Sequence, residues 1–326
     1  MGKLGVRRRT HHSRMKLLSL TQTRNPVNSR NDSRMPLPWL RMATMAGLLI
    51  TLAANVAVEA TAQSPSGAAK LSPERIAEIL ASPDRSAADR TNDIRRKPAQ
   101  MLAFIGIVPG MVAVDLSSGG GYTTELIARA VGPTGRAYGQ SAPRDPARAP
   151  TPPAAPEGAA TPAAPAPSAP AATAPSATPT TPMRLAERAK NPAAGNIVAV
   201  VQKFEDPFPP AIASNGVDLV TLMFNYHDLG HMGVDRAQMN KAVFAALKPG
   251  GMYVIADHSG RPGTGISESG TLHRVEEAFL RKEVEAAGFK LVAEGDFMRN
   301  PSDPRDKNTP DPPQPKDEFV LKFVKP

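Results

Sequence analysis

Residues that could bind a nucleotide-like ligand follow a short apolar run in the first half of the chain. Asp115 ends the run Val-Ala-Val-Asp, and Ser117, Gly119 and Gly121 follow at alternate positions. Open α/β sheets bind nucleotides at a strand, a glycine-rich turn and a helix in that order, because glycine lets the backbone approach the ligand and the helix start offers free N–H groups. The pattern predicts ligand binding, and a tight structural turn of the same composition remains the alternative.

A second group of residues could perform acid–base chemistry. Outside the first 34 residues the chain has four histidines: His227, His231, His258 and His273. Histidine titrates near neutral pH and can act as a general base on a hydroxyl or amine. We predict that His227, Asp228 and His258 act on the substrate and assign no metal. A metal site of His227, His231 and His258 with a carboxylate, and structural hydrogen bonding alone, remain alternatives.

Alternating strands and helices must position these residues. Apolar runs predict strands at 111–116, 135–139, 197–201, 217–223 and 252–256, and a closing strand pair at 290–294 and 319–324. The helical pattern falls at 71–81, 87–105, 122–131, 235–247 and 272–287, with an interruption of the second region at Pro98. This order predicts an α/β fold with a mostly parallel sheet and helices on both faces. His227 and His258 then follow strand ends, and His273 opens the next helix; such strand ends share one crevice, where ligands bind in these folds.

The turn after Asp115 resembles motif I of class I S-adenosylmethionine-dependent methyltransferases, an acid followed by three spaced glycines. Ser117 stands at the first glycine position, while Gly119 and Gly121 match. The run Leu-Lys-Pro-Gly-Gly-Met at 247–252 resembles the turn that precedes the fifth strand of these enzymes. The resemblance implies a doubly wound, seven-stranded, Rossmann-like sheet with an antiparallel last strand. It also implies S-adenosylmethionine as the cofactor.

Several shorter motifs resemble a family of exported bacterial predicted methyltransferases. They lie at 225–228, 257–260, 272–276 and 299–306. Together the two resemblances imply methyl transfer to an unknown small-molecule or other acceptor. An exported, non-catalytic module that binds a nucleoside or small ligand on a degenerate methyltransferase fold is the alternative, because Ser117 and residue Gln140 depart from the usual site.

The methyltransferase resemblance places the cofactor across the C-terminal ends of the first four strands. The residues assigned to it are Asp115, Ser117, Gly119, Gly121, Gln140, Glu205, Asp206 and Asn225. Gln140 stands where these enzymes usually have an acid for the ribose hydroxyls, and an uncharged amide binds them more weakly. Glu205 and Asp206 occupy the loop that faces the adenine amine, or form only a solvated turn before proline.

The net charge of +9 does not indicate a nucleic-acid partner. The first 34 residues contain nine basic residues and one acid, so the rest of the chain is close to neutral. We predict a small-molecule cofactor and acceptor as partners, and no nucleic acid. The chain contains no cysteine, which excludes disulfides, thiolate catalysis and cysteine-ligated zinc.

The N-terminal region has the pattern of a targeting segment. An uncharged apolar stretch at 42–58 precedes Ala60-Thr-Ala62, which predicts a signal peptide over 35–62 and an exported protein, periplasmic or secreted, that meets the membrane only through this segment. An uncleaved anchor is the alternative. Residues 1–34 form a basic, disordered extension, with Met35 as an alternative start. The predicted domain covers 63–326, interrupted at 141–182 by a disordered insert that holds 13 of the 35 prolines.

Overall fold

The computed structural model describes residues 69–144, 179–308 and 315–326. The predicted extension 1–34, the predicted signal peptide 35–62 and most of the predicted insert 141–182 lie outside the described residues. Among the helices of the described part, none is long and apolar enough to cross a lipid bilayer.

Seven strands form one sheet in the order β3-β2-β1-β4-β5-β7-β6. Their bounds are β1 (Val112–Leu116), β2 (Arg136–Ser141), β3 (Ile197–Val201), β4 (Val217–Met223), β5 (Leu247–His258), β6 (Lys290–Gly295) and β7 (Glu318–Val324). Only β7 runs against its neighbours β5 and β6, and the remaining pairs are parallel. The predicted fold class is therefore confirmed: a doubly wound, mostly parallel, seven-stranded sheet with an antiparallel last strand.

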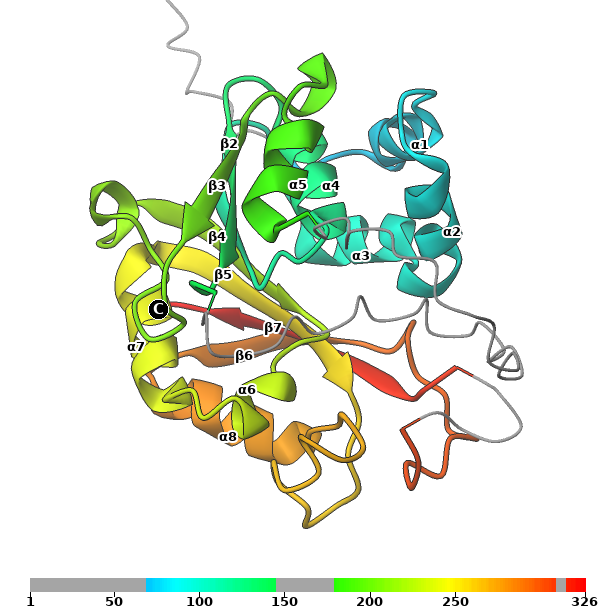
Figure 1. Ribbon diagram of the computed structural model, residues 1–326, viewed down its shortest axis with the longest axis vertical. Helices are drawn as coiled ribbons and strands as arrows, with labels where there is room; N and C mark the ends of the chain where they lie inside the picture. The colour runs from blue at the N-terminus through cyan, green and yellow to red at the C-terminus, as the bar shows by residue number, and fades with distance from the viewer. Residues whose placement is uncertain (1–68, 145–178, 309–314) are drawn as a thin grey trace, which may run out of the picture. The chain divides into compact units, whose positions relative to one another are not determined.

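Helices cover both faces of this sheet (Figure 1). Helices α1 (Pro73–Ala81), α2 (Ala87–Arg96), α3 (Pro98–Ile105), α4 (Tyr122–Val131) and α5 (Thr181–Arg188) lie toward one side, and α7 (Arg236–Ala246) and α8 (Glu277–Ala286) toward the other. The short helices are α6 (Asp228–His231), η1 (Pro192–Ala194) and η2 (Pro210–Ile212). Ala113 belongs to the core under the first group and Val114 to the core under the second. Successive strand residues point to opposite faces, so β1 is buried on both.

Two helices depart from the prediction. Helix α5 begins at Thr181, inside the expected insert, with Pro182 in its first turn, where proline is well tolerated. Helix α8 begins at Glu277, five residues later than predicted. The intervening segment cannot be helical because His273 has φ +52° and Val275 forms a parallel bridge with Ser259.

Candidate functional site

The glycine-rich turn starts from a buried carboxylate at the end of β1. Asp115 is only 3% exposed and lies beside Thr221 on the adjacent parallel strand β4. The hydroxyls of Thr124 and Thr221 donate to its two carboxylate oxygens at 2.7 and 2.8 Å. Burial raises the pKa of Asp115 to about 6, although these hydrogen bonds favour the ionised form. Asp115 therefore fixes the base of the turn.

The turn itself uses three left-handed residues, with φ of +54° at Ser117, +54° at Gly119 and +80° at Gly121. A side chain on Gly121 would lie 2.8 Å from atoms of Leu185 and Arg188, so the packing of α5 requires glycine there. Gly119 is exposed, and a methyl group on it would meet no atom closer than the Ser117 carbonyl oxygen at 3.9 Å. The surface beside Gly119 is thus open to a ligand.

Gln140 holds the turn from the end of β2. Its side chain is fully buried, its Oε1 accepts from the Ser117 N–H at 3.0 Å, and its Nε2 donates to the Gln202 carbonyl at 2.7 Å. A contact with a ribose hydroxyl would require one of these bonds to break. The ribose role of Gln140 stays a prediction. In the structure its side chain connects the glycine-rich turn to Gln202.

The acidic loop after β3 lies next to helix α7. Glu205 Oε1 accepts from the Asp235 N–H at 3.1 Å, and Asp235 is the N-cap of that helix. Asp206 is exposed on the same loop. The adenine role of these two acids stays a prediction, with Asp206 the one whose side chain is exposed to solvent.

Asn225 connects the glycine-rich turn to the histidines. The Ser117 hydroxyl donates to Asn225 Oδ1 at 2.5 Å, and Asn225 Nδ2 donates to Asp228 Oδ2 at 3.0 Å. The structure thus brings the predicted cofactor residues Ser117 and Asn225 together. Asn225 in turn connects Ser117 to Asp228.

His227 lies between two carboxylates. Asp257, which is fully buried, accepts from the His227 backbone N–H at 2.8 Å and lies 2.5 Å from its Nδ1. The other ring nitrogen, Nε2, lies 3.2 Å from Asp228 Oδ1. Burial alone would lower the pKa of His227, but the charge of Asp257 and the contacts with Asp228 outweigh it and raise the pKa to about 10. In this state the ring is an imidazolium, which donates protons and does not act as a general base.

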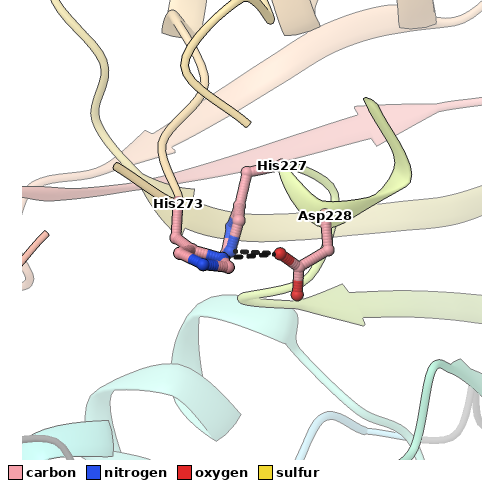
Figure 2. A group of neighbouring side chains, drawn as sticks. All are labelled: His227, Asp228 and His273. Atoms are coloured by element: carbon pink, nitrogen blue, oxygen red, sulfur yellow. Dashed lines mark hydrogen bonds and ion pairs between the residues drawn. The ribbon is translucent and has the colours of Figure 1, made fainter. Parts of the chain in front are cut away.

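Asp228 collects histidines from two segments. Its Oδ1 faces His227 Nε2 and lies 2.8 Å from Nδ1 of His273, which comes from the loop before α8 (Figure 2). Burial would raise the pKa of Asp228, but the two histidines lower it to about 2. His231 Nδ1 is 3.8 Å from the same oxygen and 3.0 Å from the Ser269 hydroxyl. The tight group is therefore His227, Asp228 and His273.

His258, predicted to act on the substrate, lies behind His227. It is 2% exposed, and its ring centroid is 5.2 Å from that of His227. Its Nδ1 lies 3.0 Å from Glu318 Oε1, which Arg95 also contacts at 3.0 Å. His258 is close to the predicted site but faces β7 and not the solvent.

Two arginines at this edge of the sheet were not predicted. The guanidinium of Arg96, at the end of α2, lies 4.0 Å from the ring centroid of Phe224, and both residues line an apolar cavity of ≈ 20 Å³ beside Tyr122. That volume holds about one water molecule. Arg188 on α5 donates to the Gly120 carbonyl at 2.7 Å. The helical pattern predicted the region of α2, and the charged, amphipathic pattern of α5 could have indicated that helix, but neither pattern shows which groups the two arginines contact.

Comparison with known proteins gave matches only among solved structures. No family model matches the chain, and no curated protein matches its sequence. A SAM-dependent methyltransferase from Aquifex aeolicus aligns with a TM-score of 0.47 and 14% identity, over 79% of this chain and 100% of that one. An arsenic(III) S-adenosylmethionine methyltransferase from Chlamydomonas reinhardtii aligns with a TM-score of 0.46 and 14% identity, over 78% of this chain and 74% of that one. A 16S rRNA methyltransferase from Catenulisporales acidiphilia aligns with a TM-score of 0.40 and 15% identity, over 79% of this chain and 97% of that one.

Proposed function

We propose that this protein is an S-adenosylmethionine-dependent methyltransferase that acts on an acceptor still to be identified. The observation that carries the proposal is the strand order β3-β2-β1-β4-β5-β7-β6 with only β7 reversed, combined with the glycine-rich turn between β1 and α4. Ligands of doubly wound sheets bind at the carboxyl ends of the strands, at the point where the strand order reverses, which here lies between β1 and β4.

The cofactor would lie against the open side of the turn. Helix α4 has Gly121 at its N-cap and no side-chain cap, so the amides ahead of Thr124, whose own N–H bonds to Asp115, can bind an anionic group. Gly119 offers exposed backbone with free space beside it. Both features support binding of the cofactor's amino-acid and ribose portion next to Gly119.

The acceptor would lie beside His227, Asp228 and His273. Methyl transfer is an in-line displacement that depends mainly on positioning and on exclusion of water. An oxygen or nitrogen acceptor also loses a proton, so its side of the site must take up that proton or stabilise the resulting charge. The Asn225 bridge puts these three residues next to the turn, which supports this placement.

Gly119→Ala is expected to weaken S-adenosylmethionine binding at least about tenfold, which corresponds to about 1.4 kcal/mol. The added methyl group would occupy the space that we assign to the cofactor. Isothermal titration of the purified full-length protein with S-adenosylmethionine provides the measurement.

Gly250→Ala is the matched control for this substitution. Gly250 lies in the exposed Lys-Pro-Gly-Gly turn at the start of β5 and has φ +77°, and a methyl group added to it would meet no other atom within 4 Å. Each variant therefore bears the strain of a side chain at positive φ, about 1–2 kcal/mol in the free protein. Equal affinities in the two variants, or no saturable binding by the unmodified protein, would refute the proposed function.

A further inference from the structure

We infer that His227, Asp228 and His273 form a binding site for one divalent transition-metal ion. The three residues offer His227 Nε2, Asp228 Oδ1 and His273 Nδ1, and each residue has a ligand atom within 4.8 Å of the others (Figure 2). The carboxylate oxygen lies 3.2 Å from one nitrogen and 2.8 Å from the other. An ion about 2.0–2.1 Å from each ligand would set adjacent ligand atoms roughly 2.9–3.3 Å apart, and the two oxygen–nitrogen distances are close to this range.

The residues around the site orient two of the three ligands. Asp257 holds the Nδ1 of His227, so that only Nε2 faces Asp228, and a bound ion would replace the proton that Nε2 carries in the imidazolium. Asn225 donates to the second oxygen of Asp228 and leaves Oδ1 directed at the two histidines. Metal-binding histidines usually donate their other nitrogen to a carboxylate, which fixes the tautomer and the ring orientation. Asp257 is fully buried and also accepts from the His258 backbone N–H, so its own position is fixed.

The donor set indicates the class of ion. Two imidazoles and one carboxylate suit zinc and other first-row transition metals, whereas calcium and magnesium prefer oxygen ligands. Three protein ligands leave coordination positions for water or a substrate atom, as in catalytic metal sites. The side chains of Asp228 and His273 are 23% and 39% exposed, so an ion can reach them from solvent.

A metal ion here would give the acceptor side of the proposed site a specific chemistry. The ion would bind an acceptor oxygen and lower its pKa, which favours a hydroxyl-bearing acceptor. This role rests on the proposed methyltransferase function. Binding of the ion does not, because it can be measured without S-adenosylmethionine, and the failure of one proposal leaves the other standing.

The test is a zinc titration of the full-length, chelator-treated protein, followed by elemental analysis. We expect one equivalent bound per chain, with at least about 100-fold weaker binding in Asp228→Asn and in His273→Asn. Asparagine is chosen at 273 because it tolerates the positive φ of this position. Asp257→Asn tests the positioning role and is expected to weaken zinc binding by about 10–100-fold. Circular dichroism checks that each variant is folded.

Two controls separate this site from adventitious binding. His231→Asn removes the neighbouring histidine that is not a ligand, and a His11→Ala, His12→Ala double variant removes the N-terminal pair. Both are expected to keep the one-equivalent site at unchanged affinity. The absorption spectrum of Co²⁺ bound to the His11→Ala, His12→Ala variant reports on the ligands without any substitution at the site. The inference would be overturned if Asp228→Asn and His273→Asn each still bound zinc tightly, or if the His11→Ala, His12→Ala variant bound no tight equivalent of zinc. The three residues would then form only a charged hydrogen-bond network.

Discussion

Replacing Asp257 with alanine is expected to lower the free energy of unfolding by about 3–5 kcal/mol. The carboxylate is fully buried, and it accepts from the His227 and His258 backbone N–H groups and contacts the His227 ring. Alanine would leave these donors without a partner. It would also remove the carboxylate that pairs with the buried imidazolium of His227, and an unpaired charge in the interior is costly. Urea unfolding monitored by circular dichroism at pH 7 measures the loss.

Asp235→Ala is the matched control for Asp257→Ala. Asp235 is an exposed N-cap whose side chain accepts one backbone N–H, from Gln238. Its loss is expected to cost about 1 kcal/mol. If the two substitutions had equal effects, Asp257 would not be the buried anchor of the histidine group.

Asp115 is expected to make the protein less stable as the pH rises from 4 to 7. Its carboxyl has a pKa of about 6 in the folded state, against 3.8 as its ordinary value, because burial disfavours the charge. Between these values the folded state binds a proton that the unfolded state releases, so stability falls with increasing pH. The shift corresponds to about 3 kcal/mol. In Asp115→Asn this pH-dependent loss should disappear.

The measurement is the free energy of unfolding of the two proteins at pH 4 and pH 8. The difference between wild type and Asp115→Asn isolates this one group, since other titrating groups are common to both. Asp235→Asn serves as control, because asparagine caps a helix as well as aspartate does. A wild-type protein whose stability relative to Asp115→Asn did not change with pH would contradict the assignment of Asp115 as a strongly buried carboxyl.

Most of the fold could be predicted from local patterns. The apolar run ending at Asp115 and the Lys-Pro-Gly-Gly turn at the start of β5 predicted strands that the structure contains, and Gly250 has the expected positive φ of +77°. Gly288, at φ +106°, follows α8 as predicted. These signals are local, because a turn that needs a positive φ favours glycine whatever surrounds it.

The start of α8 could not be predicted in the same way. Periodicity extended the helix back to Leu272, but the bridge between Val275 and Ser259 holds that segment extended. Helix α5 was hidden because Pro182 fits a helix start as well as a proline-rich segment. In both places a contact between distant residues decides between conformations that the local sequence allows.

For the candidate site, the sequence placed Ser117, Asn225, His227 and Asp228 near one another, as the structure does, but it did not reveal their hydrogen-bond partners. Residue types do not reveal whether a polar side chain is already hydrogen-bonded to other groups of the protein. Gln140 is bound to Ser117 and Gln202, and Glu205 is bound to the backbone of Asp235. His273 contacts Asp228 and does not begin a helix, and the ring of His258 contacts Glu318. These pairings depend on how strands and loops meet, which no spacing rule records.

A structure of the protein bound to S-adenosylhomocysteine tests the central claim most directly. We predict that the ligand lies across the carboxyl ends of β1, β2 and β4, with its amino-acid portion against the backbone of Gly119 and the first turn of α4. Bound ligand at any other place, or an unliganded turn in crystals grown at saturating ligand, would contradict it.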